Sequence, residues 1–211
     1  MPERPQLRIT VFSDYICPFC HVADQRLLRL RDSFDLRINW CWLEIHPETP
    51  AEGAPIESLG YAPERWQALM QSLAEMSASD GLQMAEHDWT TNSHRALLLA
   101  EAAKLEGAEV FYPLHRALFR AFFEENRNIG DPEVLRELAL KAGVPEARIE
   151  AAWNEPVYEQ RLARYRAAAA ELGVQATPTC FIGERRINGV VPEDLLRSAA
   201  EAALRAGGAH G

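Results

Sequence analysis

Apolar and polar residues alternate along two short segments near the start of the chain, and a helical repeat separates them. Residues 7–13 alternate in this way, as a strand with one buried face does, and residues 36–43 repeat the pattern. Between them, apolar residues recur at helical spacing over residues 18–32. The pattern therefore predicts a strand–helix–strand unit.

The middle of the chain has the composition of a loop followed by helices. Proline, glycine, glutamate and alanine dominate residues 47–63, which predicts a loop and a domain crossing. Helical spacing then predicts helices over residues 63–77, 93–106, 110–125, 131–142, 145–153 and 157–172. The last third predicts strands at 177–182 and 185–188 and a helix at 192–205. This order indicates an α/β protein, βαβ … αββα, with an inserted all-helical domain.

One pair of cysteines lies where the first predicted strand gives way to the first helix. A thiol in the first turn of a helix faces unpaired backbone N–H groups and the positive end of the helix dipole, and both favour the thiolate. The pKa of such a cysteine falls from about 8.5 to roughly 3.5–7.5. The spacing in Cys17-Pro18-Phe19-Cys20 brings Cys20 one turn behind Cys17, close enough to attack a mixed disulfide there. We therefore predict a thiol–disulfide oxidoreductase or isomerase with Cys17 as the nucleophile and Cys20 as the resolving thiol.

Composition and charge indicate which classes of partner are excluded and which compartment is expected. The net charge of −9 argues against nucleic acid and anionic membrane surfaces, which recruit basic patches. Residues 1–6 show neither the basic nor the apolar part of a secretion signal, and no apolar run approaches the ~18 residues of a membrane span. Four cysteines in 211 residues are too few for a secreted disulfide scaffold. We expect a cytoplasmic protein.

Several motifs lie along the chain, namely Ser13 to Cys20, Trp40 with Glu44 and Pro47, Asn128 to Leu135, and Thr177-Pro178-Thr179. Together with the order of the elements, they resemble the thioredoxin superfamily, and the helical block resembles its DsbA family in particular. They are similar to the cytoplasmic FrnE-like branch, and the resemblance covers roughly residues 7–205. It implies a thioredoxin fold in which residues 1–48 and 157–211 form one discontinuous domain and residues 49–156 form the inserted helical domain.

The resemblance also implies a site around the cysteine pair. In the family the Thr177–Pro178 bond is cis and lies beside Cys17, which leaves the Thr177 backbone free to pair with an extended substrate. We count Pro178 as catalytic with the two cysteines, and we expect substrate-binding roles for Thr177, Phe19, Pro18 and Asn92. Asn92 belongs to a motif at the mouth of the helical domain, which leaves glutathione open as a co-substrate. No tightly bound cofactor is expected, and the expected partners are proteins or small molecules that carry thiols or disulfides.

One position departs from the family pattern. Many members carry a buried acid six residues before the first active-site cysteine, where it serves the resolving thiol as a proton acceptor. The residue here is Val11. Either water or another carboxylate then takes the proton, and Glu44 is the candidate by fold logic, although a solvated strand-end carboxylate is the simpler interpretation.

Two other functions compete with the redox hypothesis. Glutathione-dependent isomerases and transferases of the kappa type share the layout but characteristically carry serine in place of Cys17. A non-enzymatic metal site would need Cys17 and Cys20 to be completed by Cys41 and Cys180, which form no second close-spaced motif, so no metal is expected. We expect Cys41 and Cys180 to be buried and inert. The direction of electron flow, the reduction potential, the substrate and the oligomeric state are not given by the sequence.

Overall fold

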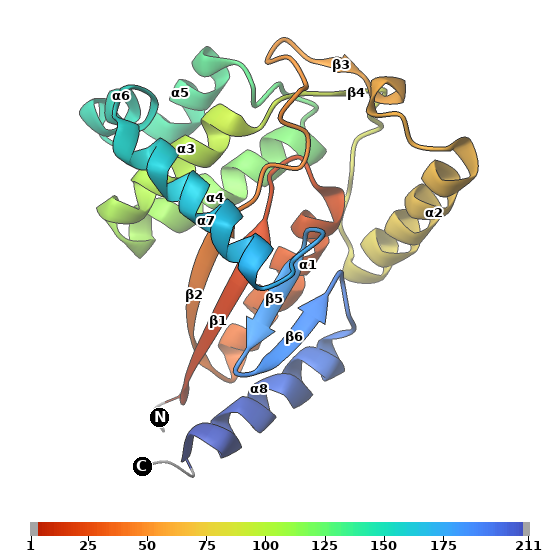
Figure 1. The fold of residues 1–211 in the computed structure, drawn as a ribbon, viewed down its shortest axis with the longest axis vertical. Helices are drawn as coiled ribbons and strands as arrows, with labels where there is room; N and C mark the ends of the chain where they lie inside the picture. Colours follow the sequence, from red (N-terminus) through yellow and green to blue (C-terminus); the bar gives the residue numbers. More distant parts are fainter. Residues whose placement is uncertain (1–3, 209–211) are drawn as a thin grey trace.

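The computed structural model describes residues 4–208, and a four-stranded mixed sheet lies at their centre (Figure 1). Its order is β2-β1-β5-β6, with β1 and β2 parallel and the other two pairs antiparallel. The strands are β1 (Gln6–Ser13), β2 (Asp35–Trp42), β5 (Thr179–Ile182) and β6 (Arg185–Asn188). The helices of this part are α1 (Pro18–Arg29), which a 3-10 turn (Leu30–Asp32) extends, and α8 (Glu193–Gly208). This is the predicted thioredoxin fold.

The sheet is covered on both faces because side chains alternate along β1. Leu7, Ile9 and Val11 pack in the large core that includes side chains of α1 and α8. Phe12 points the other way and packs beside Ala169 of α7 (Pro156–Glu171), which crosses the opposite face of the sheet (Figure 1). The last three residues of β1 are all buried. The strand therefore delivers the chain to the start of α1 inside the protein.

A block of helices lies between β2 and β5 in the sequence. Its members are α2 (Pro63–Asp80), α3 (His94–Ala103), α4 (Ala108–Phe123), α5 (Pro132–Lys141) and α6 (Glu146–Asn154), with a 3-10 turn (Lys104–Glu106) after α3. Figure 1 shows α3 to α6 gathered beyond one end of the sheet and α2 standing apart, beside α1. All of the predicted helices are present, with ends within about three residues of those expected. None of the helices between residues 4 and 208 combines the length and the apolar composition that a bilayer crossing requires.

The segment over residues 47–63 contains more structure than the predicted loop. Two residues form β3 (Ala54–Pro55), which pairs antiparallel with β4 (Trp89–Thr90), and a 3-10 turn follows (Ile56–Leu59). A two-residue strand leaves no alternation to detect, and proline argues against a strand in any sequence reading. The loop prediction was therefore wrong here for want of a local signal.

The motif that begins at Asn128 ties this segment to the helical block. The Asn128 amide donates to the carbonyl oxygen of Ala51 (2.8 Å) and accepts from the backbone N–H of Gly130 (2.8 Å). Thr91 donates to the same Ala51 oxygen (3.0 Å). A Cβ atom on Gly130 would overlap both Thr91 Oγ1 and the Ala51 oxygen. Only glycine fits at this point, because the two backbones approach so closely.

A buried ion cluster fixes α2 against α1. The Asp80 carboxylate, with its side chain 4 % exposed, accepts from Arg26 Nε (2.6 Å) and from Arg29 Nη1 (2.8 Å). Arg26 also donates to the carbonyl oxygen of Val191 (3.0 Å), which precedes α8. These bonds join α1, the end of α2 and the segment that precedes α8.

We expect Asp80→Ala to lower the free energy of unfolding by about 3–5 kcal/mol, because it leaves the Arg26 guanidinium in a buried place without its carboxylate. Urea unfolding followed by circular dichroism measures this. Glu201→Ala is the control, since it removes an exposed ion pair with Arg205 (3.7 Å) and should cost less than about 1 kcal/mol. Equal effects of the two substitutions would contradict the structural role of Asp80.

Candidate active site

Cys17 lies at the N-terminus of α1 and Cys20 lies one turn inside it. Cys17 is the N-cap residue, and Pro18 occupies the first helical position, where a missing N–H costs no hydrogen bond. The carbonyl oxygen of Cys17 accepts from the backbone N–H of Cys20 (3.0 Å). The first helical turn thus holds both thiols on one rigid segment.

The loop that precedes β5 lies against Cys17. Cys17 Sγ is 3.5 Å from the carbonyl oxygen of Thr177, although 160 residues separate the two in sequence. The Thr177–Pro178 peptide bond is cis. Pro178 is buried, whereas Thr177, Pro18 and Phe19 are half-buried. The structure therefore brings the two cysteines, Thr177 and Pro178 into one place, with Pro18 and Phe19 beside them.

The surroundings move the pKa values of the two thiols in opposite directions. The pKa of Cys17 is lowered, chiefly by a hydrogen bond from the Cys20 thiol and then by Thr177 and the Cys20 N–H, against the effects of burial and of the Asp14 charge. Burial raises the pKa of Cys20 well above its ordinary value. The hydrogen bond that the Cys20 thiol donates to Cys17 raises this pKa further. Cys17 is 4 % exposed and Cys20 is 2 % exposed, so the two thiols differ in pKa and hardly in exposure.

Asp14 is a member of this site that sequence reasoning missed. Its side chain is fully buried directly after β1, where Oδ1 accepts from the Ile16 N–H (3.3 Å) and Oδ2 from the Ile45 N–H (2.8 Å). Its carbonyl oxygen accepts from the Cys17 N–H (3.3 Å). Burial raises the pKa of Asp14 to about 6. The available signal was an acidic residue directly after a strand whose end is buried.

Glu44 and Asn92 lie together, next to this turn. The Asn92 amide donates to Glu44 Oε1 (3.3 Å) and to the carbonyl oxygen of Pro47 (3.2 Å), and its oxygen accepts from the His94 N–H (2.8 Å). The Glu44 side chain is 8 % exposed, so its interpretation as a solvated carboxylate is wrong. In this structure all of the polar atoms of the Asn92 side chain are engaged within the protein.

His94 bridges two carboxylates, which the sequence did not suggest. Its Nδ1 lies 3.1 Å from Glu44 Oε2, and its Nε2 lies 2.7 Å from Glu159 Oε1 on α7. The hydrogen bond to Glu44 raises the pKa of His94 to about 9, with Glu159 contributing in the same direction. His94 is therefore a cation at neutral pH, and the Glu44–His94–Glu159 cluster joins the end of β2 to two helices.

A second buried chain of hydrogen bonds joins the turn before Cys17 to the helical block. The Tyr15 hydroxyl lies 2.8 Å from His115 Nδ1, and His115 Nε2 lies 3.1 Å from Asp24 Oδ1. Burial raises the pKa of Tyr15, so its hydroxyl stays protonated. One residue of α4 thus connects the active-site turn with α1.

Residues 8–201 match the family described as the DSBA-like thioredoxin domain. The chain belongs to this family. The chain is 29 % identical over 199 residues to the uncharacterized protein YwbO of Bacillus subtilis (strain 168), covering 92 % of this chain and 95 % of that protein.

Two of the similar solved structures illustrate the shared fold. A probable DsbA oxidoreductase from Streptomyces coelicolor has a TM-score of 0.80 at 24 % identity, over 96 % of this chain and 91 % of that one. The cytosolic disulfide reductase DsbM from Pseudomonas aeruginosa, solved with GSH, has a TM-score of 0.69 at 19 % identity, over 94 % of this chain and 100 % of that one. At these identities the likeness concerns the fold.

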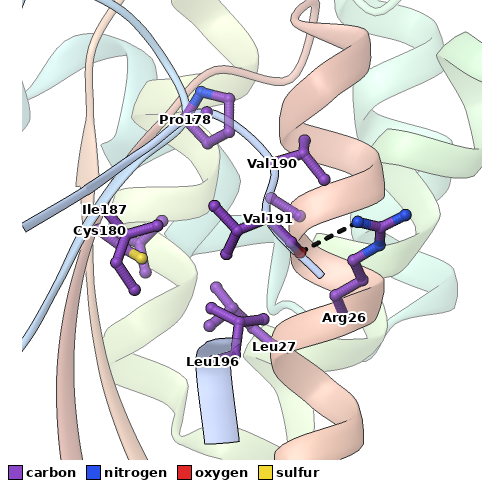
Figure 2. A pocket seen from close by; sticks show the side chains of 11 residues that line it. Arg26, Leu27, Pro178, Cys180, Ile187, Val190, Val191 and Leu196 are labelled. Carbon is purple, nitrogen blue, oxygen red and sulfur yellow. Dashed lines mark hydrogen bonds between the residues drawn. The ribbon is translucent and has the colours of Figure 1, made fainter. Parts of the chain in front are cut away.

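The two other thiols of this DSBA-like domain are buried outside the Cys17–Cys20 pair. Cys180 lines a small cavity behind Pro178, with Val11, Ile187 and other apolar side chains around it (Figure 2). Burial raises the pKa of Cys180 to about 12 and that of Cys41 to about 11. Both are therefore protonated at neutral pH, as expected for inert structural thiols.

The four-cysteine metal site considered above is not assembled. Cys180 pairs with Val11 across β5 and β1, whereas Cys41 pairs with Phe12 across β2 and β1. Adjacent residues of β1 face opposite sides of the sheet, so Cys41 and Cys180 do as well. The sheet itself separates the two proposed ligands.

We expect iodoacetamide at mildly acidic pH to modify Cys17 first, because Cys17 is the one of the four cysteines whose pKa is lowered. Peptide mapping by mass spectrometry on the reduced protein follows the four sites separately. Unfolding in urea supplies the control, since all four thiols should then react at similar rates. Labelling of Cys20 or Cys180 as fast as Cys17 in the folded protein would refute the assignment.

Folding stability should decline with alkaline pH through His94. The pKa of His94 is about 9 in the folded state against 6.5 for the free side chain, so its stabilisation is complete below pH 6.5 and is lost as the pH rises to 9. Over this interval, His94→Gln should show a smaller loss of stability than the wild type in urea titrations at each pH. His46→Gln leaves the Glu44–His94–Glu159 cluster intact and should retain the wild-type slope. Identical slopes for all three proteins would count against the ion cluster.

Proposed function

We propose that the protein catalyses thiol–disulfide exchange through Cys17 and Cys20. The observation that carries this proposal is that the pKa values of the two thiols at the start of α1 are shifted in opposite directions. A thiol of lowered pKa sits at the N-cap, a thiol of raised pKa lies behind it, and the Thr177 carbonyl lies 3.5 Å from the first sulfur. Membership in the DSBA-like family supports the same reaction class.

The exchange proceeds in two steps that balance. The Cys17 thiolate attacks one sulfur of a substrate disulfide, so that a Cys17–substrate bond forms, the substrate S–S bond breaks, and the other sulfur leaves as a thiolate that takes a proton. Cys20 then loses its proton and attacks Cys17 Sγ. The Cys17–Cys20 disulfide forms and the second substrate thiolate leaves. The reverse sequence oxidises a dithiol substrate.

The surrounding residues receive roles that follow from their positions. We assign Thr177 and Pro178 to holding an extended substrate segment beside Cys17, since a backbone edge binds without demanding a particular side chain. Pro18 and Phe19, both half-buried, provide an apolar contact next to the reacting sulfur. Asn92 acts through its hydrogen bonds to Glu44 and Pro47, which hold the neighbouring loop.

The substrates that we propose are protein disulfides and small thiols such as glutathione, and the compartment is the cytoplasm. The support for glutathione and for the compartment is the fold shared with a cytosolic disulfide reductase solved with GSH. The motifs similar to the FrnE-like branch point the same way, and the net charge of −9 disfavours nucleic acid and anionic membranes as partners.

Cys17→Ser should reduce insulin disulfides no faster than the uncatalysed reaction, because no thiolate remains to attack. Cys20→Ser should instead accumulate a mixed disulfide on Cys17 when it is mixed with glutathione disulfide, since the resolving step is lost. Turbidity assays and intact-mass spectrometry measure the two outcomes.

Cys180→Ala is the matched control for these variants, because it removes a buried thiol outside the pair and should keep most of the activity. If Cys17→Ser were as active as Cys180→Ala, the proposed reaction would have to be abandoned.

A further inference from the structure

The proposed function does not say which group accepts the proton of the Cys20 thiol. Cys20 attacks Cys17 as a thiolate, yet Cys20 is 2 % exposed and its pKa is raised. A buried thiol in this state needs a base inside the protein. The inference that follows rests on the proposed thiol exchange and concerns which residue is that base.

Asp14 is in the right place to take this proton. It lies on the buried turn between β1 and α1, and its carbonyl oxygen holds the Cys17 N–H (3.3 Å). Its carboxylate is close enough that its charge opposes ionisation of Cys17, and its backbone lies beside the Cys20 sulfur. The same turn therefore places the Asp14 backbone against both thiols and its carboxylate within electrostatic reach of Cys17.

Few interactions stabilise the negative charge of the Asp14 carboxylate. Only the backbone N–H groups of Ile16 and Ile45 donate to it with good geometry, and among residues 4–208 no cationic side chain forms an ion pair with it. A buried carboxylate in such surroundings accepts a proton readily. This separates Asp14 from Glu44, which is paired with the His94 cation at 3.1 Å.

The polar and titratable groups that face Asp14 come from three elements. Tyr15 and Cys17 lie on the turn before α1, and Cys20 lies in its first turn. The others are Glu44, which follows β2, and Ser93, which precedes α3. The Ser93 hydroxyl is fully buried, has no partner of good hydrogen-bond geometry among the described residues, and lowers the pKa of Asp14, whereas the charge of Glu44 raises it. Glu44 contacts His94, which in turn contacts the exposed Glu159.

We propose that Asp14 is the general base that accepts the Cys20 proton while Cys20 attacks the mixed disulfide on Cys17. The Cys20 S–H bond breaks and the proton joins a carboxylate oxygen of Asp14. The Cys17–Cys20 bond forms with the electron pair of Cys20, and the bond from Cys17 to the substrate breaks. The substrate sulfur leaves with that electron pair, and Asp14 returns the proton to it or to solvent, which restores the carboxylate.

The test separates the two steps by rapid mixing of reduced protein with glutathione disulfide, acid quenching and mass spectrometry between pH 4.5 and 8.5. The first phase forms the Cys17–glutathione mixed disulfide and the second phase resolves it. In the wild type the second phase should rise with pH to a plateau, with an inflection near 6. Asp14→Asn should slow the second phase at pH 7 by about 100-fold or more and remove the inflection.

The first phase provides a readout that a merely structural role would not produce. Asp14→Asn removes a negative charge near Cys17, so attack by Cys17 should be unchanged or faster at pH 6 while resolution is slower. Wild-type resolution in a folded Asp14→Asn protein would overturn the proposal, as would equal slowing of both phases.

A second variant keeps the proposal testable if the asparagine amide, which opposes the Ile45 N–H, prevents folding. Ser93→Ala removes the hydroxyl that favours the charged form of Asp14, so the inflection should move to higher pH. Ser77→Ala is the matched control, a buried serine on α2 whose hydroxyl contacts Met84 Sδ (3.6 Å), and it should leave the inflection in place. An inflection unmoved by Ser93→Ala would overturn the proposal.

The same assay distinguishes this proposal from the proposed function. If no mixed disulfide forms on Cys17, the exchange reaction itself is wrong. If the mixed disulfide forms and resolves without dependence on Asp14, the reaction stands and only the role of Asp14 falls.

Discussion

The site depends on hydrogen bonding at the N-terminus of α1, inside the protein. β1 ends with buried residues, so the turn that follows it and the first turn of α1 lie out of water. In this low-dielectric place, donors that point at Cys17 stabilise its thiolate more than they would in water. The same burial is the largest contribution to the raised pKa values of Cys20 and Asp14. Hydrogen bonding therefore outweighs burial at Cys17, whereas burial outweighs hydrogen bonding at Cys20 and Asp14.

The helical block takes part in holding this turn. The Tyr15–His115–Asp24 chain crosses from the turn to α4 and back to α1, and all three side chains are buried. His21, directly after Cys20, stacks on Phe119 and Phe123 of α4. Burial lowers the pKa of His21, so it contributes packing more than charge. The block therefore sets the position of the first turn of α1 as well as covering the end of the sheet.

The sequence was informative where a local pattern decides the structure. Alternation predicted β1 and β2 and helical spacing predicted the helices, because each element buries one face. The pair Cys17 and Cys20 and the partner segment Thr177-Pro178 were recognised from motifs. The contact between them, across 160 residues, came from the resemblance to a family and not from any periodicity.

Residues whose environment comes from distant segments could not be predicted in this way. The sequence does not indicate the burial of Asp14, which depends on Ile45 and Ser93 reaching it in the folded chain. It favours a solvated carboxylate at Glu44, because the partner His94 lies 50 residues away. The strand β3 has only two residues and carries no pattern of its own. In each case the missing information is tertiary.

The most direct test of the account is the redox equilibrium of the cysteine pair in glutathione buffers of graded ratio, read by peptide mapping. We predict a single two-electron transition in which Cys17 and Cys20, and neither Cys41 nor Cys180, become joined. Its midpoint should lie within roughly −270 to −120 mV, the span of known thiol–disulfide oxidoreductases. The absence of a Cys17–Cys20 disulfide at every ratio, or a transition that involves Cys41 or Cys180, would contradict the account.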